Sequence, residues 1–119
     1  MYKLKSFSKW AKPERLEDGE LRAAVQELEQ GLIGAHLGNG LYKKRVAKKG
    51  AGKRGGHRCL LAFKNQKRTI FLFGFSKSEK DNLSNEQLKL LKQLAKHYLA
   101  LDEDEIIKLI KNGSLIEVK

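Results

Sequence analysis

The sequence predicts an α+β fold in which two N-terminal helices precede a three- to four-stranded, mainly antiparallel twisted sheet, and helices follow it. Apolar residues recur at helical spacing near both ends of the chain. The middle of the chain holds short runs of branched and aromatic residues, which are typical of strands. The 119 residues, 40% of them apolar, suit one domain spanning 1–119 with one modest core. We expect the helices to cover one face of the sheet and the charged side chains to occupy the other.

The N-terminal third predicts two helices and a loop. Residues 1–12 carry aromatic side chains three positions apart and predict a short helix that ends before Pro13. Residues 19–30 have apolar positions at helical spacing, with Asp18 as the expected N-cap. Four glycines in residues 31–40 predict a connecting loop.

Three strands are expected next, at residues 41–48, 57–64 and 69–75. The four polar residues 65–68 form a connection of hairpin length, so the last two strands should be antiparallel neighbours. Residues 114–118 could add a small terminal strand.

Two helices should follow the strands. Ser84 and Gln87 form a capping box at the start of residues 84–101, which have one apolar face. A shorter helix is predicted over residues 103–111, with Asp102 as its N-cap.

The positive charge of the chain is concentrated in its middle third. The net charge is +11, yet residues 41–80 alone contain thirteen basic residues and one acidic residue, or +12. Within residues 41–58, eight of eighteen positions are Lys or Arg and four are Gly. Such a run needs a polyanion or solvent against it, and its glycines allow backbone N–H groups to approach a phosphate. We interpret it as a phosphate site for nucleic acid, although a solvated surface or a docking patch for an acidic protein would have the same composition.

Strand alternation predicts which cations converge. Lys43 and Arg45 share a face of one strand, and Arg58 can join them if the next strand pairs with it. His57 should then lie on the face opposite Arg58. We expect Lys53, Arg54 and Lys77 to reach the same surface from the flanking segments, and we count Lys48 and Lys49 as further RNA-binding residues.

Other site classes fit poorly. A phosphate-binding P-loop would need Gly in place of Ala47, Ser or Thr in place of Arg54, and a following helix. The three histidines are scattered without carboxylates at ligand spacing, so we expect no metal or other cofactor. The single cysteine, Cys59, excludes an internal disulfide and is expected to be buried. The sequence shows neither a signal peptide nor a membrane span, which favours a cytoplasmic protein.

Three separated motifs resemble those of the RelE/HigB-like toxins of bacterial type II toxin–antitoxin systems. They are a Lys-x-Arg strand at 43–45, a glycine-rich basic loop followed by Arg at 49–58, and a Lys-x-Glu element at 77–79. The resemblance covers roughly residues 1–101, and residues 102–119 receive no function from it.

This resemblance implies a RelE-like toxin fold and an mRNA interferase, an endoribonuclease that cleaves mRNA in the ribosomal A site without metal. It also implies a cognate antitoxin that inhibits the toxin and binds operator DNA. The matching RNA-contacting or catalytic positions are Lys43, Arg45, Lys53, Arg54, Arg58 and Lys77. Some relatives use a C-terminal Tyr or a set of His residues that has no match here.

The expected chemistry is attack of an RNA 2′-OH on the adjacent phosphorus. Arg45, Arg54 and Arg58 would stabilise the extra negative charge. Because a lysine surrounded by cations loses its proton more readily, Lys53 or Lys77 is the expected base, with His57 as an alternative. Two other functions stay open: a non-catalytic RNA- or DNA-binding module, and a ParE-like toxin that acts on a protein target.

Overall fold

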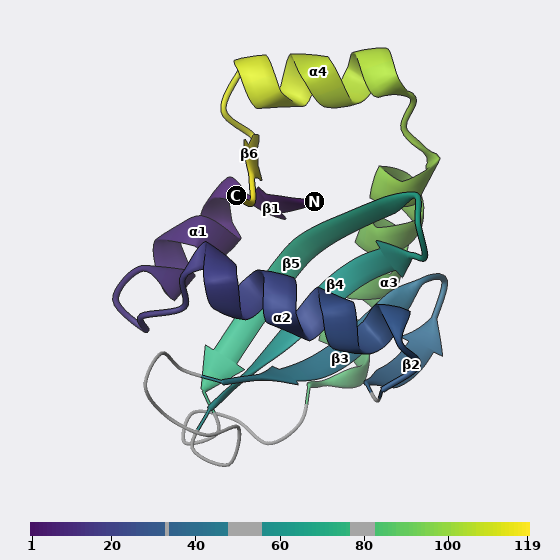
Figure 1. Cartoon of the computed structure of the whole chain (residues 1–119). Helices are drawn as coiled ribbons and strands as arrows, with labels where there is room; N and C mark the ends of the chain where they lie inside the picture. Colours follow the sequence, from purple (N-terminus) through teal and green to yellow (C-terminus); the bar gives the residue numbers. More distant parts are fainter. Residues whose placement is uncertain (33, 48–55, 77–82) are drawn as a thin grey trace.

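The computed structural model describes residues 1–32, 34–47, 56–76 and 83–119, which form four helices and a six-stranded sheet (Figure 1). The elements in chain order are β1 (Tyr2–Leu4), α1 (Lys5–Ala11), α2 (Asp18–Glu29), β2 (Ala35–Gly38), β3 (Leu41–Val46), β4 (His57–Lys64), β5 (Arg68–Ser76), α3 (Asn85–Ala100), α4 (Glu103–Lys111) and β6 (Leu115–Glu117). The α+β class is as predicted, but the sheet has more strands than the three or four expected.

The sheet is mixed, with the strand order β2-β3-β4-β5-β1-β6. The β1 strand runs parallel to β5, with Tyr2 beside Ile70, and the other neighbouring strands are antiparallel. Two strands were missed by the sequence analysis. The β1 strand occupies the start of the segment predicted as a helix, and β2 lies in the predicted glycine-rich loop. Both are short and owe their conformation to pairing with strands elsewhere in the chain.

Helices cover both faces of the sheet, so the prediction of helices on one side was wrong. The α1 and α2 helices pack on one face around a cluster that includes Phe7, Leu21 and Phe71. On the other face, α3 packs around a cluster that includes Leu60 and Leu91. Figure 1 shows α2 crossing one face of the sheet and α3 behind it. Any ligand must therefore reach the sheet where these helices leave it uncovered.

Two of the three predicted N-cap residues are confirmed. Capping boxes open α3 at Ser84 and α4 at Asp102, as expected. The N-cap of α2 is Glu17, not Asp18. Asp18 instead accepts hydrogen bonds from Lys3 Nζ at 2.9 Å and from the backbone N–H of Lys119 at 2.7 Å. This carboxylate thus links the two ends of the described chain to the start of α2.

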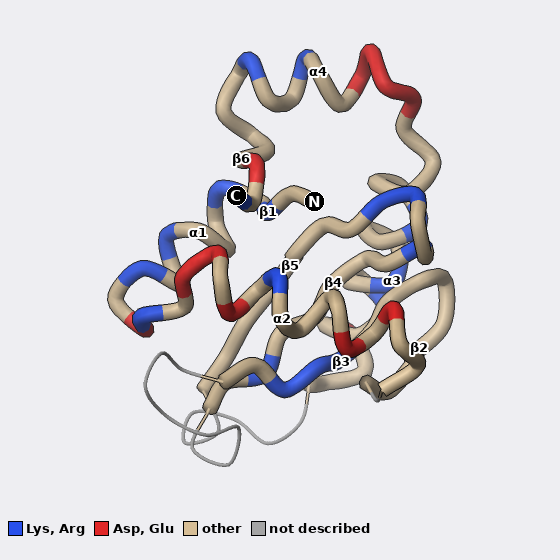
Figure 2. Tube along the Cα trace, in the orientation of Figure 1, with Lys and Arg blue, Asp and Glu red and all other residues tan. Residues whose placement is uncertain are grey.

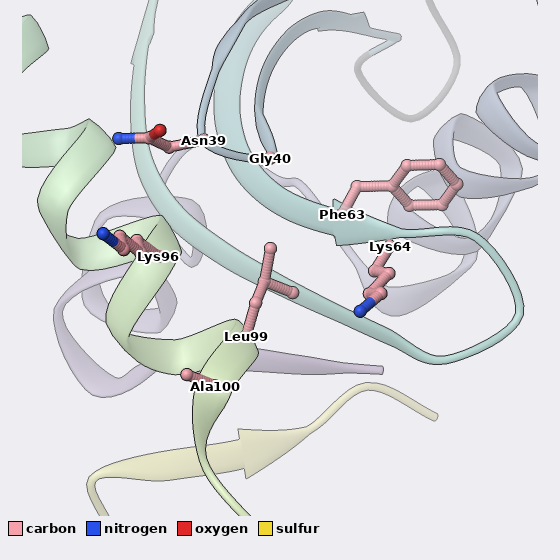
Figure 3. A pocket seen from close by; sticks show the side chains of 7 residues that line it. All are labelled: Asn39, Gly40, Phe63, Lys64, Lys96, Leu99 and Ala100. Carbon is pink, nitrogen blue, oxygen red and sulfur yellow. The ribbon is translucent and has the colours of Figure 1, made fainter.

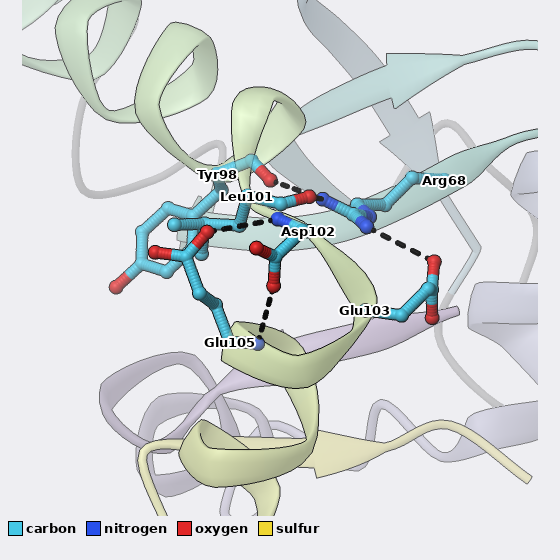
Figure 4. Close-up of polar contacts among 6 residues, drawn as sticks. All are labelled: Arg68, Tyr98, Leu101, Asp102, Glu103 and Glu105. Atoms are coloured by element: carbon cyan, nitrogen blue, oxygen red, sulfur yellow. Dashed lines mark hydrogen bonds and ion pairs between the residues drawn. The ribbon is translucent and has the colours of Figure 1, made fainter.

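The C-terminal residues are part of the sheet rather than an appendage. The β6 strand pairs with β1, and Ile106 of α4 and Leu115 of β6 are buried. Arg68 holds the junction between α3 and α4 by donating from Nη1 to the carbonyl oxygens of Tyr98 at 2.8 Å and Leu101 at 2.6 Å (Figure 4). We therefore assign residues 102–119, which were expected to be an extension, a structural role.

Candidate nucleic-acid interface

The β3 and β4 strands bring two arginines directly opposite each other. Arg45 pairs with Arg58 across the antiparallel ladder, and Lys43 lies two residues earlier on β3, on the same face. Arg45 is exposed, and Lys43 and Arg58 are half-buried. Figure 2 shows the run of basic residues along β3. The predicted convergence of these three cations on one face is confirmed; it is the α3 face of the sheet.

No described carboxylate neutralises the two arginines. Within residues 1–32, 34–47, 56–76 and 83–119, no carboxylate forms an ion pair with Lys43, Arg45 or Arg58. Like charges directly opposite in a sheet destabilise it. A bound anion would remove this repulsion, and a guanidinium can grip a phosphate with two parallel hydrogen bonds. The surface is therefore suited to an RNA or DNA phosphate.

Lys44 lies between these cations in sequence but points the other way. Its side chain is buried under α2, where Nζ lies 2.8 Å from Glu27 Oε1. By composition, Lys44 belongs to the basic run of residues 41–58, for which a polyanion partner is expected. Strand alternation indicates the opposite face, but only the packing of α2 on β3 reveals the acidic partner.

His57 also lies on the α1 and α2 side of the sheet, as alternation predicted. It is only 4% exposed, its Nε2 lies 2.7 Å from Glu14 Oε1, and its ring makes an edge contact with Trp10 at 5.4 Å between centroids. The sheet separates this ring from Arg58. We therefore no longer propose His57 as an acid or base, and we assign it to the contact between β4 and the α1–α2 connection.

The remaining predicted site residues lie outside the described residues, and so they stay predictions. These residues are Lys48, Lys49, Lys53, Arg54 and Lys77. The prediction made for one described residue next to the site is confirmed. Cys59 is buried, and burial raises the pKa of its thiol, which makes it a poor nucleophile. Gly56, directly before β4, is buried as well.

Residues 1–118 match the family model described as "RelE toxin of RelE / RelB toxin-antitoxin system". The chain belongs to this RelE toxin family. The resemblance predicted from the three motifs is thus confirmed. The match also includes most of the 102–119 segment, which the motif comparison had left outside the family. Membership implies a cognate antitoxin as a partner of this toxin.

The toxin has a pocket at the other end of the central strands from the arginine pair. A cavity of about 380 Å³ is lined by Asn39, Gly40, Phe63, Lys64, Lys96, Leu99 and Ala100 (Figure 3). Arg58 and Lys64 are six residues apart on β4, which corresponds to about 20 Å along a strand. Figure 3 shows the side chains of Lys64 and Lys96 on opposite sides of Leu99. This cavity is therefore separate from the arginine pair and does not gather its cations around one anion.

The described residues of this RelE-family chain show neither a metal site nor a membrane span. No three His, Cys, Asp or Glu residues among the described positions gather as metal ligands would. No described helix is long and apolar enough to cross a membrane.

Proposed function

We propose that this toxin is a ribosome-dependent endoribonuclease that cleaves mRNA in the ribosomal A site without a metal ion. The observation that supports the proposal best is the pairing of Arg45 with Arg58 on an accessible part of the sheet, with Lys43 beside them. Family membership supports it independently, since the family is defined by toxins of a toxin–antitoxin system. The proposed location is the cytoplasm, where translated mRNA is found.

The proposed reaction transfers the phosphorus from one oxygen to another. The 2′-OH of a nucleotide loses its proton as its oxygen attacks the adjacent phosphorus, and the bond to the 5′-oxygen of the next nucleotide breaks. The departing 5′-oxygen takes up a proton, which leaves a 2′,3′-cyclic phosphate and a 5′-OH. No oxidant, reductant or additional reactant is needed. The protein must hold the in-line geometry, stabilise the added negative charge and move two protons.

The strand pair can meet the electrostatic requirement. Arg45 and Arg58 are held on neighbouring strands of a six-stranded sheet, so their backbones do not need to reorganise during the reaction. Phe75, which is cross-strand from Arg58, is buried and supports the arginine from the next strand. We propose Arg58 as the principal charge-stabilising residue, Arg54 as a second one, and Lys53 or Lys77 as the base.

The proposal is tested by expressing the toxin in a translation extract and mapping new mRNA ends by primer extension. We expect wild-type protein to create ends with a 5′-OH only in mRNA that is being translated. Loss of one charge-stabilising donor typically costs about 10²- to 10³-fold in rate, so Arg58→Ala should cut at most about one hundredth as fast. Arg22→Ala is the matched control, because it removes an exposed arginine from α2 on the opposite face.

Each outcome separates the hypotheses. If wild type produces no new ends but binds RNA in a salt-sensitive way, the toxin is a non-catalytic binding module. If neither RNA cleavage nor RNA binding occurs, a protein target of the ParE type gains support. If Arg58→Ala cuts as fast as Arg22→Ala, the assignment of Arg58 is wrong even though the nuclease activity stands.

A further inference from the structure

A β-bulge in β5 directs an aromatic side chain to the surface beside the arginine pair. The register between β4 and β5 pairs Leu60 with Phe73 but the next residue, Leu61, with Phe71, so Leu72 is the extra residue. A bulge interrupts strict alternation and places two successive residues on roughly one face. Leu72 is buried in the cluster beneath α3, whereas Phe73 is 37% exposed.

Phe73 lies on the same face of the sheet as Lys43, Arg45 and Arg58. The α3 face carries two adjacent rows of residues that run across β3, β4 and β5. One row is Lys43, Leu60 and Phe73, and the other is Arg45, Arg58 and Phe75. The rings of Phe73 and Phe75 lie 6.2 Å apart, centroid to centroid. Arg58 is therefore a diagonal cross-strand neighbour of Phe73, at a typical separation of about 7–8 Å.

We propose that Phe73 is a base-stacking residue of the RNA site, on which one unpaired base rests while the neighbouring phosphate is held by Arg45 and Arg58. This inference rests on the proposed function and adds a residue to its RNA site. Single-stranded RNA is commonly held in this way, with cations along the backbone and aromatic rings against the bases. Leaving a phenylalanine ring partly in water costs free energy, which stacking of a base would recover.

A base is favoured over an apolar protein segment by the charges around the ring. Three cations without ion pairs in the described chain lie in the same two rows as Phe73. Burying them against an apolar segment would strip their water without supplying an anion. A nucleotide supplies the anion and the aromatic surface together.

The test uses a short single-stranded oligoribonucleotide containing 2-aminopurine, whose fluorescence falls when it stacks. We expect quenching by wild type and by Phe73→Trp, and loss of quenching with Phe73→Leu, which keeps an apolar side chain. Phe73→Leu should bind roughly tenfold more weakly with an unchanged salt dependence, because stacking releases no counterions. Arg58→Ala should instead make the slope of log affinity against log salt shallower by about 0.7. Thermal unfolding of each variant checks that it is folded.

The inference and the proposed function fail in different ways. If wild type binds RNA and cleaves mRNA while Phe73→Leu matches it in affinity, quenching and cleavage sites, the stacking role is refuted and the nuclease stands. If Phe73→Leu binds RNA normally but binds the cognate antitoxin more weakly, the ring belongs to a protein interface, and the stacking role is again refuted. If wild type neither binds RNA nor produces new ends, the proposed function itself is refuted.

Discussion

Removing the Arg68 side chain should destabilise the fold by about 3 kcal/mol. Arg68 is 10% exposed and donates two hydrogen bonds from Nη1 to carbonyl oxygens at the end of α3, at 2.8 and 2.6 Å. Hydrogen bonds from a charged donor contribute about 1.5–3 kcal/mol each, and a cation at a helix C-terminus adds a few tenths. Its third partner, Glu103, lies 3.2 Å from Nη2 but is 80% exposed, so this ion pair contributes at most about 1 kcal/mol.

Urea and thermal unfolding of Arg68→Ala measure this anchor. For a chain of this length, 3 kcal/mol corresponds to a decrease in Tm of roughly 10 °C. Glu103→Ala should cost less than about 1 kcal/mol, because it leaves both carbonyl contacts in place. Lys67→Ala is the control, since it removes an exposed neighbouring cation and should change stability by less than about 0.5 kcal/mol.

The two outcomes that would refute this reasoning are distinct. Equal losses in Arg68→Ala and Glu103→Ala would mean that the ion pair, and not the carbonyl contacts, provides the stability. A loss below about 0.5 kcal/mol in Arg68→Ala would mean that water replaces Arg68 at the helix end, so that the α3–α4 junction does not depend on it.

Two further predictions concern stability. Gly74→Ala should lower the Tm sharply, because a Cβ at this position would overlap the ring of Trp10, whereas Gly19→Ala, whose Cβ has no atom closer than 3.8 Å in its surroundings, should have little effect. Burial raises the pKa of Asp18, but the hydrogen bond from Lys3 and a backbone N–H outweigh it, and the pKa ends below its ordinary 3.8. The stabilisation by Asp18 is therefore present above about pH 4 and lost as the pH falls through the lowered value, so the unfolding free energy of Asp18→Asn, measured in urea, should fall less steeply between pH 5 and pH 2.

Local sequence signals identified the helices and the central strands. The capping boxes at Ser84 and Asp102 are contacts between residues three positions apart, so the sequence alone contains both partners. The outer strands could not be recognised in this way. Tyr2 becomes a strand residue because it pairs with Ile70 and Glu117, and nothing in its own neighbourhood indicates either partner.

The site residues also fall into two groups, those placed by local sequence patterns and those placed only by tertiary packing. Alternation alone places Arg45 and Arg58 on one face and His57 on the other, and the structure agrees. The acidic partner of Lys44 depends on how α2 packs, and the outward turn of Phe73 depends on a bulge. Both are consequences of tertiary packing, which a period-two pattern does not contain.

On one face of β3 and β4 the basic side chains have carboxylate partners, and on the other face they have none in the described chain. This contrast bears on the role of Arg58. On the α1 and α2 side, Lys44 and His57 each lie against a glutamate. On the α3 side, Arg45 and Arg58 face each other without a carboxylate partner in the described chain, an arrangement that lowers stability. Arg58→Ala should therefore unfold at a Tm equal to or above that of wild type while it loses activity. If that variant is clearly less stable, its loss of activity reflects damage to the fold, and the arginine pair no longer supports an anion site.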